Sequence, residues 1–125
     1  MRVHRFAAVV VLCSASLSVA ACSSSGDDGD AGGGLEVAVA GSDSACTPAS
    51  TDLAAGKTTF VFTNSAKAVS ELYVYDGSKV VGEVEDVLSG SSKNLTVTLA
   101  PGKTYKLTCK PGQKGDGYST EVTVE

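Results

Sequence analysis

The chain has 125 residues, four cysteines, one histidine, no tryptophan and a formal net charge of −4. This length allows a single domain with a core of modest size. The chain is acidic and has no cluster of Lys and Arg, so we do not expect a nucleic acid as a partner.

The first segment has the features of an export signal. Residues 1–5 are basic, and residues 6–20 are apolar and uncharged but fewer than the about 20 that span a bilayer. Small residues then lead directly to Cys22, as at the end of a cleavable signal peptide. The pattern resembles the lipobox of bacterial lipoproteins, which implies a signal peptide at 1–21 and a lipid on Cys22. The protein would then be anchored to the extracytoplasmic face of the cell membrane; the alternative is an ordinary signal peptide with a chance cysteine at its cleavage site.

Cleavage would limit the chemistry of the mature protein. It removes the only histidine, the only methionine, Cys13 and two arginines, and leaves eight Lys and Arg against fourteen Asp and Glu, a net charge of −6. Without histidine, Ser–His–Asp hydrolysis, histidine-based acid–base catalysis and a His₂Cys copper site are excluded. We therefore expect a protein that is not an enzyme, with redox chemistry at bound copper or iron as the one catalytic route that stays open.

A linker is expected between the signal peptide and the domain. Residues 22–34 consist, after Cys22, of Ser, Gly, Asp and a single Ala. Such a segment cannot bury enough apolar surface to fold, so we expect it to be disordered.

Residues 35–125 predict an all-β domain. Short runs in which apolar and polar residues alternate are separated by Gly, Pro, Asn and Asp, and no window shows a helical period. The predicted strands are Leu35–Ala40, Thr51–Leu53, Thr58–Thr63, Glu71–Tyr75, Lys79–Val84, Asn94–Leu99, Thr104–Cys109 and Tyr118–Val124. Short strands at this spacing indicate a β-sandwich with Greek-key connections.

Two cysteines lie in the predicted domain, Cys46 after the first strand and Cys109 at the end of a later one. In an exported protein such a pair commonly forms a disulfide. The alternative is a pair of thiolates that binds a soft or borderline metal ion, which needs further donors nearby. A sandwich can bring both residues to the same end, so the sequence leaves both interpretations open.

Glu71 is a candidate donor whose environment depends on which face of its strand is buried. It shares a face with Tyr73 and Tyr75. If that face points inward, the carboxylate needs a partner or a metal, because burying it alone is costly. If Leu72 and Val74 point inward instead, which the alternation slightly favours, Glu71 is a surface acid.

The segment around the second cysteine resembles the C-terminal end of cupredoxins. Pro101 and Gly102 predict a tight turn, after which Tyr105 and Cys109 fall on one face of a strand. A Gly-rich loop over residues 110–117 follows, but it contains no His or Met. A type 1 copper electron carrier is therefore excluded by ligand count. Tyr105 is expected to fix the strand corner through a hydrogen bond of its hydroxyl group.

A narrower pattern covers nearly the whole predicted domain. It consists of short segments in a fixed order and spacing: Asp43–Cys46, Ala55–Phe60, Thr63–Asn64, Glu71–Tyr75, Val81–Glu85, Pro101–Tyr105, Cys109–Gly112 and Gly115–Gly117. In this pattern, residues 35–125 resemble the N-terminal cupredoxin-like domain of the EfeO family, the extracytoplasmic component of a bacterial iron-uptake system.

The resemblance implies a domain that binds copper or ferric iron through a Cys, Glu and Cys set. On this chain those positions are Cys46, Glu71 and Cys109, and Asp116 in the following loop is a candidate fourth donor.

The resemblance also concerns Glu83 and Glu85, which match an acidic strand of the family. They imply a second, oxygen-rich site for a harder cation, although alternating acids on a strand are commonly solvated. The family's larger helical metal-binding domain does not occur in these residues. We therefore expect a stand-alone module that scavenges, buffers or hands over metal, with envelope metal-transport proteins as candidate partners.

Two hypotheses follow for the domain. In the first, it is a lipid-anchored module that coordinates copper or iron at Cys46, Glu71 and Cys109. In the second, it is a disulfide-stapled sandwich that binds another envelope protein without metal. The first requires metal affinity that collapses in Cys46→Ser and Glu71→Gln, whereas the second requires a stable oxidised pair and no effect of Glu71.

Overall fold

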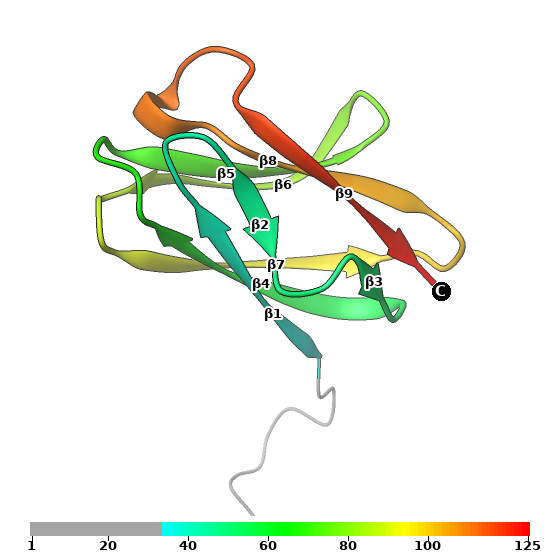
Figure 1. Ribbon diagram of the computed structural model, residues 1–125. Coiled ribbons are helices and arrows are strands. Elements are labelled where there is room, and N and C mark those ends of the chain that lie inside the picture. Colours follow the sequence, from blue (N-terminus) through cyan, green and yellow to red (C-terminus); the bar gives the residue numbers. More distant parts are fainter. Residues whose placement is uncertain (1–33) are drawn as a thin grey trace, which may run out of the picture.

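The computed structural model describes residues 34–125, which form nine β-strands and one short 3₁₀ helix (Figure 1). The strands are β1 (Leu35–Gly41), β2 (Cys46–Pro48), β3 (Asp52–Leu53), β4 (Gly56–Asn64), β5 (Ser70–Asp76), β6 (Lys79–Val87), β7 (Ser92–Leu99), β8 (Thr104–Cys109) and β9 (Tyr118–Val124), and the helix η1 (Pro111–Gln113) follows β8. The predicted signal peptide, Cys22 and most of the predicted linker lie outside the described residues. In residues 34–125, no helix is long and apolar enough to cross a bilayer.

The strands form two facing sheets. One sheet has the order β2-β1-β4-β7 and the other the order β3-β9-β8-β5-β6. Neighbouring strands are mostly antiparallel, but β1 pairs with β4, and β3 with β9, in parallel. All eight predicted strands are present, with ends that differ by at most three residues. The prediction of an all-β sandwich is therefore confirmed.

The short strand β2 is the element that the sequence analysis missed. Its three residues are too few for a visible alternation and end in Pro48, which cannot donate a hydrogen bond to a neighbouring strand. The structure places β2 at the edge of its sheet, where Gly41 at the end of β1 pairs with Cys46. This pairing fixes the position of the first cysteine.

The hydrophobic core lies between the two sheets and follows the alternation of the strands. The buried apolar side chains include Val37, Val39, Phe60, Phe62, Leu72, Val74, Leu95, Val97, Leu99, Tyr105, Leu107, Cys109, Val122 and Val124. Full burial of one such aliphatic or aromatic side chain stabilises the fold by roughly 1.5–3 kcal/mol. Residues 34–125 thus contain both sheets and the core between them, and we expect this segment to fold on its own.

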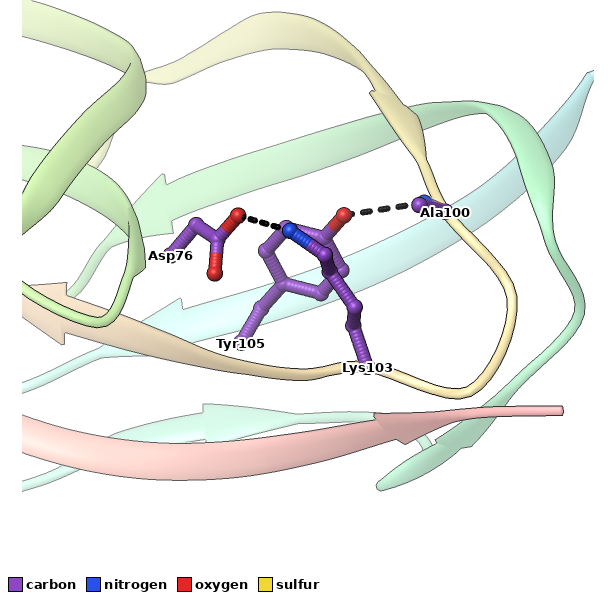
Figure 2. Close-up of polar contacts among 4 residues, drawn as sticks. All are labelled: Asp76, Ala100, Lys103 and Tyr105. Carbon is purple, nitrogen blue, oxygen red and sulfur yellow. Dashed lines mark hydrogen bonds and ion pairs between the residues drawn. The ribbon is translucent and has the colours of Figure 1, made fainter.

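The turn between β7 and β8 is held by a tyrosine corner. The N–H of Ala100 donates to the hydroxyl oxygen of Tyr105 at 2.9 Å (Figure 2). In the same turn, Lys103 forms an ion pair with Asp76 at the end of β5, and this contact raises the pKa of Lys103. The expected role of Tyr105 is confirmed.

The two ends of the sandwich differ in what they carry (Figure 1). At one end, Leu35 pairs with Thr58 near the start of β4, and the turn after β7 is hydrogen-bonded to Val124. We call this the terminal end, because the first strand starts and the last strand stops there. At the other end β1 finishes at Gly41 and residues 110–117 connect β8 to β9. We call this the loop end.

Candidate functional site

Cys46 and Cys109 form a disulfide near the loop end. They are 63 residues apart in sequence, with their Cα atoms 5.3 Å apart, and both side chains are buried. Because β2 and β8 belong to different sheets, the bond joins the two sheets covalently. Gly41 leaves the space for it, since a Cβ there would lie 3.3 Å from the sulfur of Cys109 and against the ring of Phe62. Of the two interpretations that the sequence left open, the structure contains the disulfide.

Glu71 lies on the opposite face of its sheet from the disulfide. Leu72 pairs in register with Cys109, and both point into the core. Successive residues of a strand point to opposite faces, so Glu71 is directed away from the sulfur atoms. This is the face that the alternation favoured, yet Glu71 is only 6% exposed. The ladder between β5 and β6 has a bulge at this position, and the N–H of Lys110 donates to the backbone oxygen of Glu71 at 2.9 Å.

A tyrosine hydroxyl connects carboxylates on this outer face. The hydroxyl of Tyr73 donates to Glu71 Oε2 at 3.1 Å and lies 3.5 Å from Glu85 Oε1. Partial burial, the hydrogen bond to Glu71 and the negative charges of Glu71, Glu83 and Glu85 raise the pKa of Tyr73 to about 12. At neutral pH the hydroxyl therefore keeps its proton and acts as a hydrogen-bond donor.

The structure separates the predicted metal ligands. It joins Cys46 to Cys109, but Glu71 faces away from them and Asp116 is exposed in the loop after β8. Within residues 34–125, no three or more His, Cys, Asp or Glu side chains are grouped closely enough to hold a metal ion. The acids of the predicted second site, Glu83 and Glu85, are exposed on the edge strand β6. Lipid attachment at Cys22 lies outside the described residues.

The donor set in its disulfide state does not fit a copper or iron ion. Disulfide sulfurs are not thiolates, and the sequence offers no His or Met between residues 34 and 125 to replace them. Ligation by the four predicted residues would require a reduced pair and a movement of the carboxylates toward it. That assignment stays a prediction.

The loop end also carries an open cleft of about 720 Å³. Asp43 lines it from the connection between β1 and β2, and Asp116 and Tyr118 line it from the other side. The loop of residues 110–117 is bonded to β6 through the side-chain amide of Gln113, which donates to Asp86 Oδ1 at 2.8 Å. Both residues have positive φ angles, 53° and 54°, which non-glycine residues adopt at a cost.

Sequence reasoning missed two lysines on the outer face of β8. The ammonium group of Lys106 lies over the ring of Tyr75, and that of Lys110 over the ring of Tyr73. Alternation could have found them, because they occupy the positions between and after the buried residues of β8.

Comparisons with known proteins support the expected family. A family model described as a cupredoxin-like domain matches residues 6–124. The chain is 37% identical over 93 residues to the iron uptake system component EfeO of Escherichia coli (strain K12) and, at the same identity, to that of Shigella flexneri. The matched region covers 74% of this chain but only 24% of those proteins, so the chain spans about a quarter of their length.

Solved structures share the fold at low sequence identity. An auracyanin from Roseiflexus castenholzii gives a TM-score of 0.58 with 15% identity, covering 75% of this chain and 99% of that one. An azurin (Az-iso2) from Methylomonas sp. strain J gives a TM-score of 0.56 with 10% identity, covering 73% of this chain and 98% of that one. These likenesses confirm the predicted sandwich architecture.

Proposed function

Because the chain belongs to the cupredoxin-like domain family, as its similarity to an EfeO-type domain also shows, we propose that it is a metal-handling module of the cell envelope. A lipid on Cys22 holds it at the extracytoplasmic face of the membrane. The ion is copper or iron, and the role is binding and transfer rather than catalysis. The similarity to an iron uptake component supports this assignment and makes envelope metal-transport proteins the candidate partners.

The position of the cysteine pair carries the proposal. Cys46 is bonded to Cys109, and Cys109 directly precedes the loop of residues 110–117. Exchange with an external dithiol, which is itself oxidised to a disulfide, would reduce the bond to two thiols, whose thiolate forms are preferred ligands of Cu(I). The oxidation state of the pair would then decide whether the protein can hold the ion.

Glu71 and Asp116 would add oxygen donors to the thiolates. Carboxylate oxygens suit a harder ion such as ferric iron better than sulfur does. Both side chains lie apart from the disulfide in the structure, so their participation needs a test separate from that of the cysteines.

The proposal is tested by native mass spectrometry of residues 34–125 with Cu(I), before and after mild reduction. We expect a one-to-one copper adduct only after reduction, and none in Cys46→Ser under the same conditions. The reduced wild-type domain also lacks the disulfide. The comparison therefore separates the loss of a metal ligand from the loss of the stabilising disulfide. Circular dichroism of both proteins checks that they are folded. Glu71→Gln, with the exposed Glu36→Gln as its control, reports whether the carboxylate takes part.

A second candidate function rests on the disulfide itself. A buried bond between the two sheets stabilises a sandwich without any metal, by about 2–5 kcal/mol in small exported domains. Such a domain would serve as an interaction module of the envelope. A mass two hydrogens lighter than that of the dithiol, together with no adduct even after reduction, would favour this function and contradict the first.

A further inference from the structure

Two loops rise from the outer side of the five-stranded sheet (Figure 1). One wall is the turn between β5 and β6, with Gly77 and Ser78, and the other is the loop after β8, with residues 115–117. Between them lies an open cleft of about 520 Å³, which continues past Lys106 into a recess of about 230 Å³. We call this cleft and its recess the outer groove.

Lys106 of β8 and Lys110, which directly follows β8, line the outer groove. The Nζ atom of Lys106 is 4.9 Å from the ring centre of Tyr75, and that of Lys110 is 4.4 Å from the ring centre of Tyr73. These cation–π contacts hold the ammonium groups over the sheet. Within residues 34–125 neither lysine forms an ion pair. Two positive charges are therefore fixed in one concave site without a carboxylate in contact.

Hydroxyl groups lie on the floor between the two lysines. Thr108 is on the same face of β8 as Lys106 and Lys110, and it pairs in register with Ser119 of β9. Their hydroxyl oxygens are 2.8 Å apart. This hydrogen bond uses one of the two hydroxyl protons. Thr108 is only 2% exposed whereas Ser119 is exposed, so the hydroxyl that a ligand can reach is that of Ser119. Ammonium and hydroxyl donors that converge in this way are suited to carboxylate and phosphate oxygens.

The charges around the outer groove limit the size of such an anion. Asp116 lines the cleft, Glu121 pairs in register with Lys106 from β9 and lines the recess, and Glu83 pairs with Tyr73 from the neighbouring strand. This acidic rim repels an extended polyanion such as a nucleic acid or an anionic bilayer. A compact anion between the lysines avoids the rim.

We propose that the outer groove binds a small multivalent oxyanion, a di- or tricarboxylate or a polyphosphate. Lys106 and Lys110 contact its charged groups, and the hydroxyl of Ser119 donates to it. The lysine Cα atoms are about 13 Å apart along the chain. Both side chains are long enough to bend toward each other and contact the two charged ends of one ligand. The cysteine pair lies on the opposite face of the sheet, whereas Asp116, a candidate metal donor, lines the groove. Copper binding by the cysteines and anion binding by the lysines are therefore tested with different variants, and one can fail without the other.

The experiment is a titration of ¹⁵N-labelled residues 34–125 with citrate and, separately, pyrophosphate, in a buffer free of other oxyanions. We expect saturable shifts of the backbone amides at residues 106–110, 115–119 and 77–78. The double variant Lys106→Gln/Lys110→Gln is expected to weaken binding at least about tenfold, because it removes two charge-assisted contacts. The matching double arginine variant keeps both charges and should retain binding.

Lys67→Gln is the control, because it removes a positive charge from an exposed position outside the outer groove. It should leave the dissociation constant within about twofold of the wild-type value, less than the loss of a single contact would cause. A preference for citrate or for pyrophosphate identifies the class of anion and supports the site in either case. Equal weakening in the control and the groove variants, shifts spread over the whole surface, or no saturable shift with either anion would overturn the proposal.

Discussion

Glu71, which is buried, and Tyr73, which is partly buried, form a polar pair on the outer face of the five-stranded sheet. The carboxylate is 6% exposed and accepts the hydroxyl hydrogen of the tyrosine at 3.1 Å. A charged group with so little solvent needs such a donor, because an unsatisfied buried charge is costly. The pair therefore fixes the local structure of β5 whether or not a metal binds there.

The titration of Tyr73 is a direct measure of this pair. Its pKa is raised from 10.0 to about 12, first by burial and then by the contact with Glu71. The folded state thus holds this proton more tightly than the unfolded chain. The resulting stabilisation is complete below pH 10 and is lost as the pH rises toward 12. We expect the difference in tyrosinate absorbance between the wild-type domain and Tyr73→Phe to show a group that titrates near the upper value.

Glu71→Gln separates the two causes. It removes the negative acceptor but leaves the burial, so the pKa of Tyr73 should fall only part of the way back toward 10.0. An unchanged titration curve in Glu71→Gln would show that the carboxylate charge of Glu71 does not act on Tyr73 in solution.

At the level of single residues, the sequence predicted which face of a strand a side chain occupies better than it predicted how deeply that side chain is buried. Alternation placed Glu71 on the outer face, and the turn signal placed Tyr105 at a corner, as the structure shows. The burial of Glu71 was not predictable, because Glu71 lies at a bulge and its backbone is bonded to a loop that is distant in sequence. No local sequence pattern indicates that the backbone of Lys110 will be hydrogen-bonded to that of Glu71.

Strand β8 shows how one element can serve two surfaces. Tyr105, Leu107 and Cys109 are buried in the core, whereas Lys106 and Lys110 face the outer groove. The family resemblance grouped Cys109 with Glu71, but the register between β5 and β8 places these side chains on opposite faces. The sequence could supply the residue types of a metal site but not this separation, which depends on how the strands pair.

The entry of the chain into β9 depends on a glycine that has no space for a side chain. Gly117 has a φ of +71°, and a Cβ there would collide with the backbone oxygen of Cys109. Gly115 has a φ of +73° but open space around it, which makes it a matched control. We expect Gly115→Ala to cost about 1–2 kcal/mol from the backbone conformation alone. Gly117→Ala should cost about 1–3 kcal/mol more, because the loop or the strand must shift.

Urea unfolding of the two alanine variants, followed by circular dichroism, measures this difference. Equal losses of stability would mean that the loop after β8 adapts freely and that its path over the sheet is not fixed by Gly117. The walls of the outer groove would then be less well defined than the structure shows.

The architecture of the whole molecule followed from the sequence more completely than its site did. Strict alternation in segments such as Leu95, Val97 and Leu99 predicts strands with one buried face, and that pattern is sufficient to indicate a sandwich. The parallel pairing of β1 with β4, and the small strand β2, depend on contacts between distant segments. These contacts bring Cys46 next to Cys109. The sequence alone left open whether the two cysteines form a disulfide.

Attachment to the membrane is tested on the complete protein in bacterial cells. If the lipobox interpretation is right, the wild-type protein should sediment with the membranes and partition into detergent. Cys22→Ser removes the acceptor of the lipid, and an acyl anchor is then no longer available to hold the protein there. We expect the variant to leave the membrane fraction, or to remain unprocessed with its first 21 residues still attached.

Cys13→Ser is the control for this experiment, because Cys13 lies within the apolar run and not at its boundary. It should behave like the wild-type protein. Detergent partitioning and processing of Cys22→Ser that match those of the wild-type protein would contradict the lipid anchor.

The start of β1 and the end of β9 both lie at the terminal end, which has a practical meaning for experiments on residues 34–125. Leu35 and Val124 are held at the same side of the sandwich, one strand length from Gly41 and the disulfide. A chain fused to either terminus therefore emerges away from the loop end. A domain secured through residues 1–33, or immobilised on a sensor through Glu125, would present the same surface to molecules that arrive from solution. The measurements proposed for the isolated domain can in this way be repeated on an oriented layer.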